Sequence, residues 1–170
     1  MKQLKITLFV ILFILSGTAR LIAQADTAKL YHPDADAAHD FSMAVRKAKV
    51  EGKQVLLQIG GNWCKWCIRF DKFCRQDSTI DSLLKAGFVT LHINTSKENR
   101  NLPFLATLGY PQRFGFPVFV IADSSGMRLH TQNSWYLEDG KESYDAGKVI
   151  SFLKDWSAAA LRPENYSGKE

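Results

Sequence analysis

Two cysteines separated by two residues are the part of this sequence best suited to chemistry. Cys64 and Cys67 stand in the motif W-C-K-W-C, directly after a Gly-Gly-Asn turn. Cysteines three apart at the first turn of a helix lie side by side, close enough to be bridged. The free N–H groups and the positive end of the helix dipole at that place favour a thiolate. The pattern therefore predicts a site for thiol–disulfide exchange.

The elements around the pair predict where it lies. Residues 54–59 contain a short apolar run bounded by turn residues, which is typical of a strand covered on both faces. Beyond the turn, apolar residues recur every three to four positions, as on the inner face of a helix that ends near Arg75. These residues are Trp63, Cys67, Phe70 and Cys74. We therefore expect the pair where the carboxyl end of a strand meets a helix, which is where open α/β sheets place their sites.

The remaining sequence predicts one small α/β domain after an irregular lead-in at 26–33. Further helices are expected over about 34–51, 79–85, 102–108 and 144–159, the first of them capped by Asp34 or Asp36. Further strands are expected over 88–93, 118–122 and 127–131, the last two as an antiparallel hairpin. This order gives an α/β fold of three layers, a small mixed sheet with helices on both faces.

The first 25 residues are predicted to be an export signal. Two lysines precede an apolar stretch at 6–15, and Ala23-Gln24-Ala25 supplies a small-x-small cleavage pattern. Arg20 interrupts the apolar run too early for the roughly 20 residues that a spanning helix needs. We therefore predict a protein exported to the periplasm or secreted. The expected segments are a cleaved signal peptide (1–25), an extension with its helix (26–52), the main domain (53–160) and a tail (161–170).

Composition excludes several other classes of protein. The net charge of +5 includes three basic residues of the leader, so 19 Lys and Arg face 17 acidic residues afterwards, or near +2. These cations are scattered among acids, which leaves no basic stripe for nucleic acid. Three cysteines are an odd number, which fits one redox pair and one spare thiol better than a disulfide framework.

The cysteine pair has two other interpretations, a structural disulfide and half of a zinc site. Structural bridges rarely close so short a loop at a helix start. Tetrahedral zinc needs two more ligands; Cys74 could supply one, but the four histidines show no ligand-pair spacing. Ile68 after the second cysteine excludes attachment of haem. Redox activity without a metal or an organic cofactor is the preferred interpretation.

At these residues the chain resembles the thioredoxin superfamily, in particular its exported single-domain members. The resemblance extends from about Lys53 to Trp156. It rests on W-C-K-W-C after an apolar strand and on Gly-Phe-Pro at residues 115–117, at the start of a later strand. It implies the thioredoxin-like fold and activity as a thiol–disulfide oxidoreductase on protein dithiols or disulfides.

The resemblance also implies a role for each site residue. Cys64 is implied to be the attacking thiol and Cys67 the resolving thiol. Phe116 and Pro117 are implied to form a cis peptide against the disulfide, where an extended substrate segment binds by strand addition.

Physical arguments support these roles. Cys64, exposed at the helix start, gains most from the dipole, and Lys65 adds a positive charge that favours its thiolate. Cys67, one turn later, faces the core and is shielded. Trp63 is expected to lie partly in the core, whereas Trp66 is expected to be exposed and to contact substrate.

One residue departs from the thioredoxin pattern. Thioredoxins carry a buried acid six residues before the first cysteine, and here that position is Gln58. An amide cannot take up a proton at neutral pH, so deprotonation of Cys67 is expected to rely on water or on another group. Replacing Gln58 with Asp is expected to speed turnover at pH 7.

Other conspicuous residues have plainer interpretations. Cys74, two turns after Cys67, is expected to be a buried apolar residue, with a second resolving thiol as the minor alternative. His92 is expected to be a structural histidine within a strand. Trp135 and Tyr136 either line a binding surface or pack a loop. The charged residues of the cysteine helix, Asp71, Lys72 and Arg75, are expected on its wet face.

Reduction is the expected direction, but the sequence leaves open whether the enzyme is a reductase, an oxidase or an isomerase, and it leaves a rival function open. A reductase in an oxidising compartment needs an electron donor, for which a membrane-embedded thiol carrier is the expected partner. No segment is evident for dimerisation, which disfavours an isomerase and predicts a monomer. The rival is a non-catalytic thioredoxin-like module that grips extended chains at the Phe116–Pro117 edge.

Overall fold

Four strands form one central sheet in the computed structural model, which describes residues 29–168. The strand order is β2-β1-β3-β4. The first strand, β1 (Gln54–Gly60), pairs parallel with β2 (Phe88–Asn94) and antiparallel with β3 (Val118–Ala122). The edge strand β4 (Arg128–Asn133) pairs antiparallel with β3. The predicted mixed sheet is confirmed, while the predicted leader at 1–25 lies outside the described residues.

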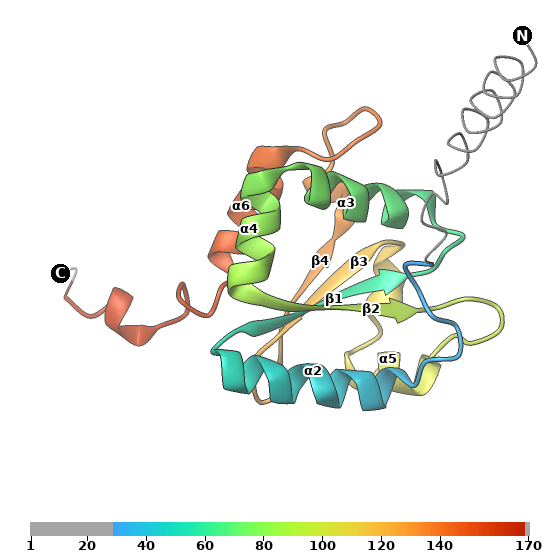
Figure 1. The fold of residues 1–170 in the computed structure, drawn as a ribbon, viewed down its shortest axis with the longest axis horizontal. Coiled ribbons are helices and arrows are strands. Elements are labelled where there is room, and N and C mark those ends of the chain that lie inside the picture. The colour runs from blue at the N-terminus through green and yellow to red at the C-terminus, as the bar shows by residue number, and fades with distance from the viewer. Residues whose placement is uncertain (1–28, 169–170) are drawn as a thin grey trace, which may run out of the picture.

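Helices cover both faces of this sheet and complete the three layers (Figure 1). One face carries α2 (Ala37–Glu51) and α5 (Leu102–Thr107). The other face carries α3 (Lys65–Gln76), α4 (Ser78–Gly87) and α6 (Ala146–Asp155). Short 3-10 turns complete the described part, namely η1 (Pro111–Phe114), η2 (Ser134–Leu137) and η3 (Pro163–Asn165).

Side chains alternate along β1, so this strand contributes to two hydrophobic cores. All seven residues of β1 are buried, as predicted for a strand covered on both faces. Val55, Leu57 and Ile59 point into the core below α2 and α5. Leu56 points the other way, into the core of α3, α4 and α6. Gln58 and Gly60 share the face of Leu56, because side chains alternate along a strand. This face of β1 is therefore the one that α3 covers.

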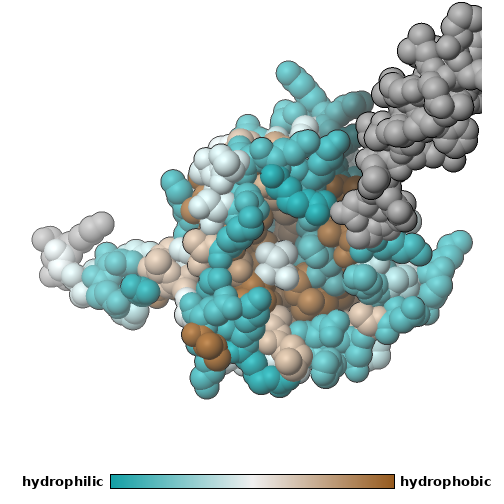
Figure 2. Space-filling view, viewed as in Figure 1, coloured by the Kyte–Doolittle hydropathy of each residue, from teal (hydrophilic) through white to brown (hydrophobic). Residues whose placement is uncertain are grey.

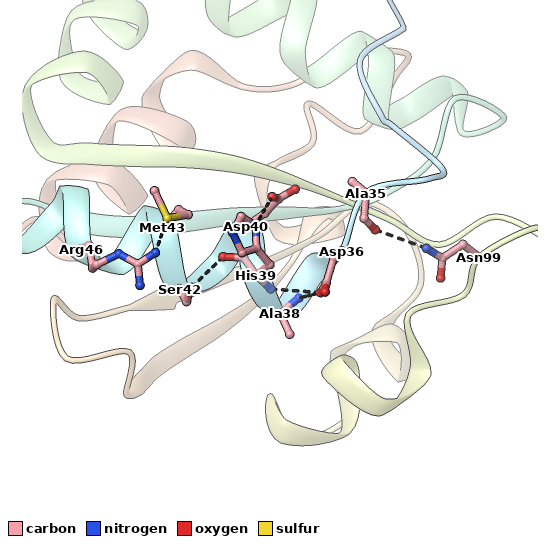
Figure 3. A network of polar contacts seen from close by, with 9 residues as sticks. All are labelled: Ala35, Asp36, Ala38, His39, Asp40, Ser42, Met43, Arg46 and Asn99. Carbon is pink, nitrogen blue, oxygen red and sulfur yellow. Dashed lines mark hydrogen bonds and ion pairs between the residues drawn. The ribbon is translucent and has the colours of Figure 1, made fainter.

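Caps set the limits of the helices. The Asp36 carboxylate accepts hydrogen bonds from the N–H groups of Ala38 and His39, each at 3.0 Å (Figure 3). This confirms one of the two predicted caps of α2. The last helix begins later than predicted, because Asp145 caps it by accepting from Lys148 N–H at 2.9 Å, and it also ends earlier, at Asp155. Tyr144 therefore lies before the helix rather than within it.

A hollow separates the two helical layers along the β2 edge of the sheet. Figure 2 shows hydrophobic atoms within it and hydrophilic residues around it. It encloses about 570 Å³ and is lined by residues of α2, α3, α4 and β2. Asp71 of α3 lines this hollow and exposes only 12 % of its side chain. The prediction that Asp71 lies on the wet face of its helix is therefore wrong.

Candidate redox site

A disulfide joins Cys64 and Cys67 at the start of α3, with Cα atoms 5.2 Å apart. Cys64 is the N-cap of that helix, and its sulfur accepts the Cys67 N–H at 3.2 Å. The turn before it closes through a hydrogen bond from Cys64 N–H to the Gly61 carbonyl at 3.0 Å. The strand, turn and helix thus follow one another as the sequence predicts. The sulfur at the cap occupies the position where a helix stabilises negative charge.

Both cysteines are shielded from solvent. Cys67 exposes 0 % of its surface, as expected, but Cys64 exposes only 5 %. The expectation that Cys64 is exposed is therefore wrong for the disulfide form. The reason is a small apolar cluster around the pair, to which Leu30, Tyr31, Trp66 and Phe116 contribute. A partner must displace part of this cluster to reach the Cys64 sulfur.

The two tryptophans of the motif lie in the reverse of their expected environments, with Trp63 exposed and Trp66 partly buried. Trp63 is 56 % exposed, and its indole N–H donates to the Thr95 carbonyl at 3.2 Å. Trp66 is partly buried, with its ring edge-to-face on Tyr144 at 5.5 Å between centroids. The predictions for both tryptophans are wrong because Trp63 precedes the helix, whereas Trp66 lies on the side of α3 that meets Tyr144.

Phe116 packs against the cluster that contains both cysteines, and the peptide bond between Phe116 and Pro117 is cis, as the resemblance implies. The Phe116 ring packs at 88° to Trp63, with centroids 5.4 Å apart. Together they border a groove of about 520 Å³. The rest of its lining includes the polar and charged residues Thr95, Ser96, Lys97, Arg100 and Gln112. An apolar floor with cations beside it suits an extended polypeptide segment.

Lys65, the remaining expected site residue, is exposed at the first position of α3. Its ammonium group adds positive charge at the helix start next to Cys64, which favours a thiolate there.

Gln58 lies directly beneath the pair. It is 2 % exposed, and its Nε2 donates to the Cys67 carbonyl at 3.0 Å and to the Tyr31 hydroxyl at 2.8 Å. Tyr31 belongs to the irregular lead-in that sequence reasoning treats as outside the domain, yet it is 0 % exposed. Sequence reasoning missed Tyr31 because nothing in its neighbourhood is periodic.

Burial shifts the pKa of three groups that line the hollow between the sheet and α3. Burial lowers the pKa of His92 to about 4, so this imidazole is uncharged at pH 7. Burial raises the pKa of Asp71, against the opposing effect of Arg75, with which it forms an ion pair. Burial also raises the pKa of Cys74 to about 12. Cys74 is 4 % exposed and free, which confirms the prediction of a buried apolar residue.

The described residues contain no group of three or more His, Cys, Asp and Glu side chains that could hold a metal ion. Between residues 29 and 168 there is also no helix long and apolar enough to cross a membrane. Trp135 and Tyr136 are 72 % and 70 % exposed on η2, so neither side chain packs a loop.

The fold and the cysteine pair together define a class of protein. A family model described as thioredoxin-like matches residues 36–124, more than half of the chain. The chain therefore belongs to the thioredoxin-like family, whose relatives are thiol–disulfide oxidoreductases.

Solved structures give the same fold. The disulphide isomerase from Xylella fastidiosa Temecula1 is 25% identical with a TM-score of 0.67, over 76% of this chain and 98% of that one. A thioredoxin from Thermus thermophilus is 16% identical with a TM-score of 0.52, over 76% and 92%. The oxidised DsbD C-terminal domain from Neisseria meningitidis is 19% identical with a TM-score of 0.50, over 72% and 97%. No curated protein matches the chain.

Proposed function

We propose that this protein is an exported thiol–disulfide oxidoreductase that reduces disulfides in other exported proteins. The observation that supports this most is the Cys64–Cys67 disulfide at the N-terminus of α3, beside the groove of Trp63 and Phe116. The Cys64 thiolate attacks one sulfur of a substrate disulfide, so that a mixed disulfide forms and the other substrate sulfur leaves as a thiolate. The Cys67 thiolate then attacks the Cys64 sulfur, and the second substrate sulfur leaves as a thiolate. The cysteines carry the two electrons, so no other cofactor is needed.

The surrounding residues take supporting roles in this proposal. Lys65 and the start of α3 stabilise the Cys64 thiolate. Trp63 and Phe116 contact the apolar side chains of the substrate in the groove. Trp66 and Pro117, which are less exposed, shape the contact around the disulfide.

The cellular setting is also part of the proposal. The expected leader at 1–25 directs the protein to the periplasm or outside the cell, where a membrane-embedded thiol carrier returns the cysteines to the reduced state. The protein acts as a monomer. The relative from Xylella fastidiosa bears the name disulphide isomerase, and this chain covers 98% of it, so domain size does not disfavour isomerisation. A reduction potential measured on the mature protein decides the direction, because a strongly reducing pair favours reductase activity.

Reduction of insulin by dithiothreitol, with the mature protein as catalyst, tests the proposal. We expect catalysis by the parent and none by Cys64→Ser. Cys74→Ala serves as the matched control and is expected to keep full activity, because Cys74 is buried in a different apolar cluster from Cys64 and Cys67. A parent that is no faster than Cys64→Ser would overturn the proposal.

A binding module that grips extended chains at the Phe116–Pro117 edge is the second candidate. The 5 % exposure of Cys64 favours it, because a shielded sulfur reacts slowly with a protein disulfide. The insulin assay separates the two candidates. Binding of an unfolded polypeptide that is equally tight in the parent and in Cys64→Ser, without turnover, would identify the module.

A further inference from the structure

Tyr31 lies beneath the disulfide although it precedes every helix and strand of the described domain. Its backbone N–H donates to Asn62 Oδ1 at 3.1 Å, and Asn62 Nδ2 donates back to the Tyr31 carbonyl at 2.8 Å. Asn62 belongs to the turn between β1 and α3. The tyrosine is thus attached to the same turn that carries Cys64.

A second contact holds the segment that carries Tyr31, residues 29–36, where it leads into α2. Asn99 Nδ2 donates to the Pro33 carbonyl at 2.9 Å and to the Ala35 carbonyl at 3.4 Å. Figure 3 shows the Asn99 side chain pointing at Ala35 from the loop that follows β2. In Figure 1 the segment, drawn in blue, passes the ends of β1 and β2 on its way to α2. Because it is held at both ends, the segment places the Tyr31 ring in one position.

Gln58 determines the direction of the Tyr31 hydroxyl proton. The Cys67 carbonyl can only accept, so the Gln58 amide must present its nitrogen there. The same nitrogen donates to the Tyr31 oxygen at 2.8 Å. The hydroxyl therefore accepts from Gln58, and its own proton remains for another acceptor.

Cys67 Sγ lies across Gly60 from this hydroxyl. A Cβ atom added to Gly60 would lie 2.3 Å from Cys67 Sγ and 3.0 Å from the Tyr31 hydroxyl oxygen. Both atoms thus border the space that the missing side chain leaves open. A larger residue at position 60 would separate them, whereas glycine lets them face each other.

We propose that the Tyr31 hydroxyl donates a hydrogen bond to the Cys67 thiolate whenever the disulfide is open, and that Gln58 is the positioning residue that directs it. The role in turnover rests on the proposed function. In the resolving step the Cys67 sulfur bonds to Cys64 Sγ, and the bond from Cys64 to the substrate sulfur breaks. The electron pair leaves on the substrate sulfur, which takes a proton from water. The Cys67 proton has already gone to solvent, and Tyr31 keeps its own proton throughout.

Among the charged and titratable groups around Tyr31 and Cys67, the Tyr31 hydroxyl is the one suited to donate a hydrogen bond to the Cys67 thiolate. Burial raises the pKa of Tyr31 well above its ordinary value, so it stays a donor where thiols titrate. His92, from β2, is neutral above its pKa of about 4. Asp71, from α3, disfavours a nearby thiolate and is partly neutralised by its ion pair with Arg75. Besides burial, His32 on the segment lowers the pKa of His92, and Cys74 on α3 raises the pKa of Tyr144, which precedes α6.

The test measures the pKa of Cys67 directly. In a Cys64→Ser, Cys74→Ala background Cys67 is the only thiol, and the pH dependence of its alkylation gives its pKa. We expect Tyr31→Phe to raise that pKa by about one unit or more, a tenfold loss of thiolate at a given pH, because a hydrogen bond to a charged group is lost. Asn62→Ala, which releases the Tyr31 backbone at an exposed position, is expected to shift the pKa in the same direction.

Tyr144→Phe is the matched control. This buried hydroxyl donates to the Trp66 carbonyl of the same helix at 3.1 Å, and its loss is expected to leave the Cys67 pKa unchanged. An unchanged pKa in folded Tyr31→Phe, or an equal shift in Tyr144→Phe, would overturn the proposal. With both active cysteines restored, Tyr31→Phe is expected to slow turnover at pH 7 and to recover the parent rate at higher pH. Because alkylation requires no turnover, the pKa readout stands even if the parent reduces no disulfide.

Discussion

At the scale of single residues, the chemistry of the site depends on groups of very different exposure. Trp63 exposes more than half of its surface to solvent, while Cys64 and Cys67 are shielded. Gln58, at the place where thioredoxins carry an acid, instead donates two hydrogen bonds. A donor at this position holds the Cys67 carbonyl and the Tyr31 hydroxyl together, which a carboxylate could not do.

Replacing Gln58 with Asp is therefore expected to have opposite effects on stability and on activity. Loss of two donors in a buried site is expected to lower the free energy of unfolding by roughly 1–3 kcal/mol. A carboxylate that can take the Cys67 proton is expected to raise turnover at pH 7. Urea denaturation and insulin reduction measure the two effects, with Gln58→Leu as the variant that loses the donors without gaining a base. Equal turnover in the Asp and Leu variants would contradict the proton-transfer argument.

Truncation of Trp63 is expected to weaken the binding of protein substrates. A central exposed tryptophan commonly contributes about 2 kcal/mol or more to an interface, so Trp63→Ala should raise the KM for a protein disulfide by tenfold or more. Reaction with a small disulfide reagent should change little. Trp135→Ala is the matched control, since that indole is 72 % exposed on η2. A similar rise in KM for both variants would contradict a specific role for Trp63.

At the scale of elements, each helix that positions the site begins at a residue that caps it. Cys64 caps α3 with a sulfur atom, so the residue that begins this helix is also the proposed attacking thiol. Asp36 caps α2, and the lead-in to that cap carries Tyr31. The position at which α2 begins thus helps to set where the preceding segment, residues 29–36, packs against the disulfide.

Asp36→Ala is expected to lower the free energy of unfolding by about 1 kcal/mol, because two N–H groups of the first turn lose their acceptor. The shift in the urea midpoint measures this effect. Asp34→Ala is the control, since Asp34 is exposed two residues earlier, outside the helix, and Asp36 is the cap. If Asp34→Ala cost as much, a general charge effect rather than the cap would be responsible.

At the scale of the whole molecule, burial of ionisable groups between the sheet and α3 links stability to pH. His92 has a pKa of about 4 in the folded protein and an ordinary value near 6.5 in the unfolded chain. The unfolded chain therefore binds more protons between these values, and stability falls as pH decreases through this window. The raised pKa of Asp71 acts in the opposite direction at the acidic end.

We expect the free energy of unfolding to fall by up to about 3 kcal/mol between pH 7 and pH 4 because of His92. In His92→Gln this part of the decrease should disappear, whatever the stability of the variant at pH 7. Urea titrations at several pH values give both curves. Parallel curves for the parent and the variant would show that His92 does not control the pH dependence.

The sequence by itself determined the local part of this structure. Apolar runs, turn residues and caps depend on neighbours a few positions apart, so strand β1, the start of α3 and the closed cysteine pair were predictable from spacing. The cis peptide before Pro117 followed from resemblance to a family. The Asp36 cap was one of two candidates, because either aspartate could begin the same helix.

Only the tertiary structure decided which side chains surround the pair. Tyr31 comes from a segment without periodicity and reaches the site through long-range hydrogen bonds to Asn62 and Gln58. The exposure of Trp63 and the burial of Cys64 and Asp71 likewise depend on elements distant in the chain. Spacing along one helix defines which residues share a face, but it does not define what packs against that face. Contacts between segments far apart in the chain set the solvent access and the pKa values on which the reactivity of the cysteine pair depends.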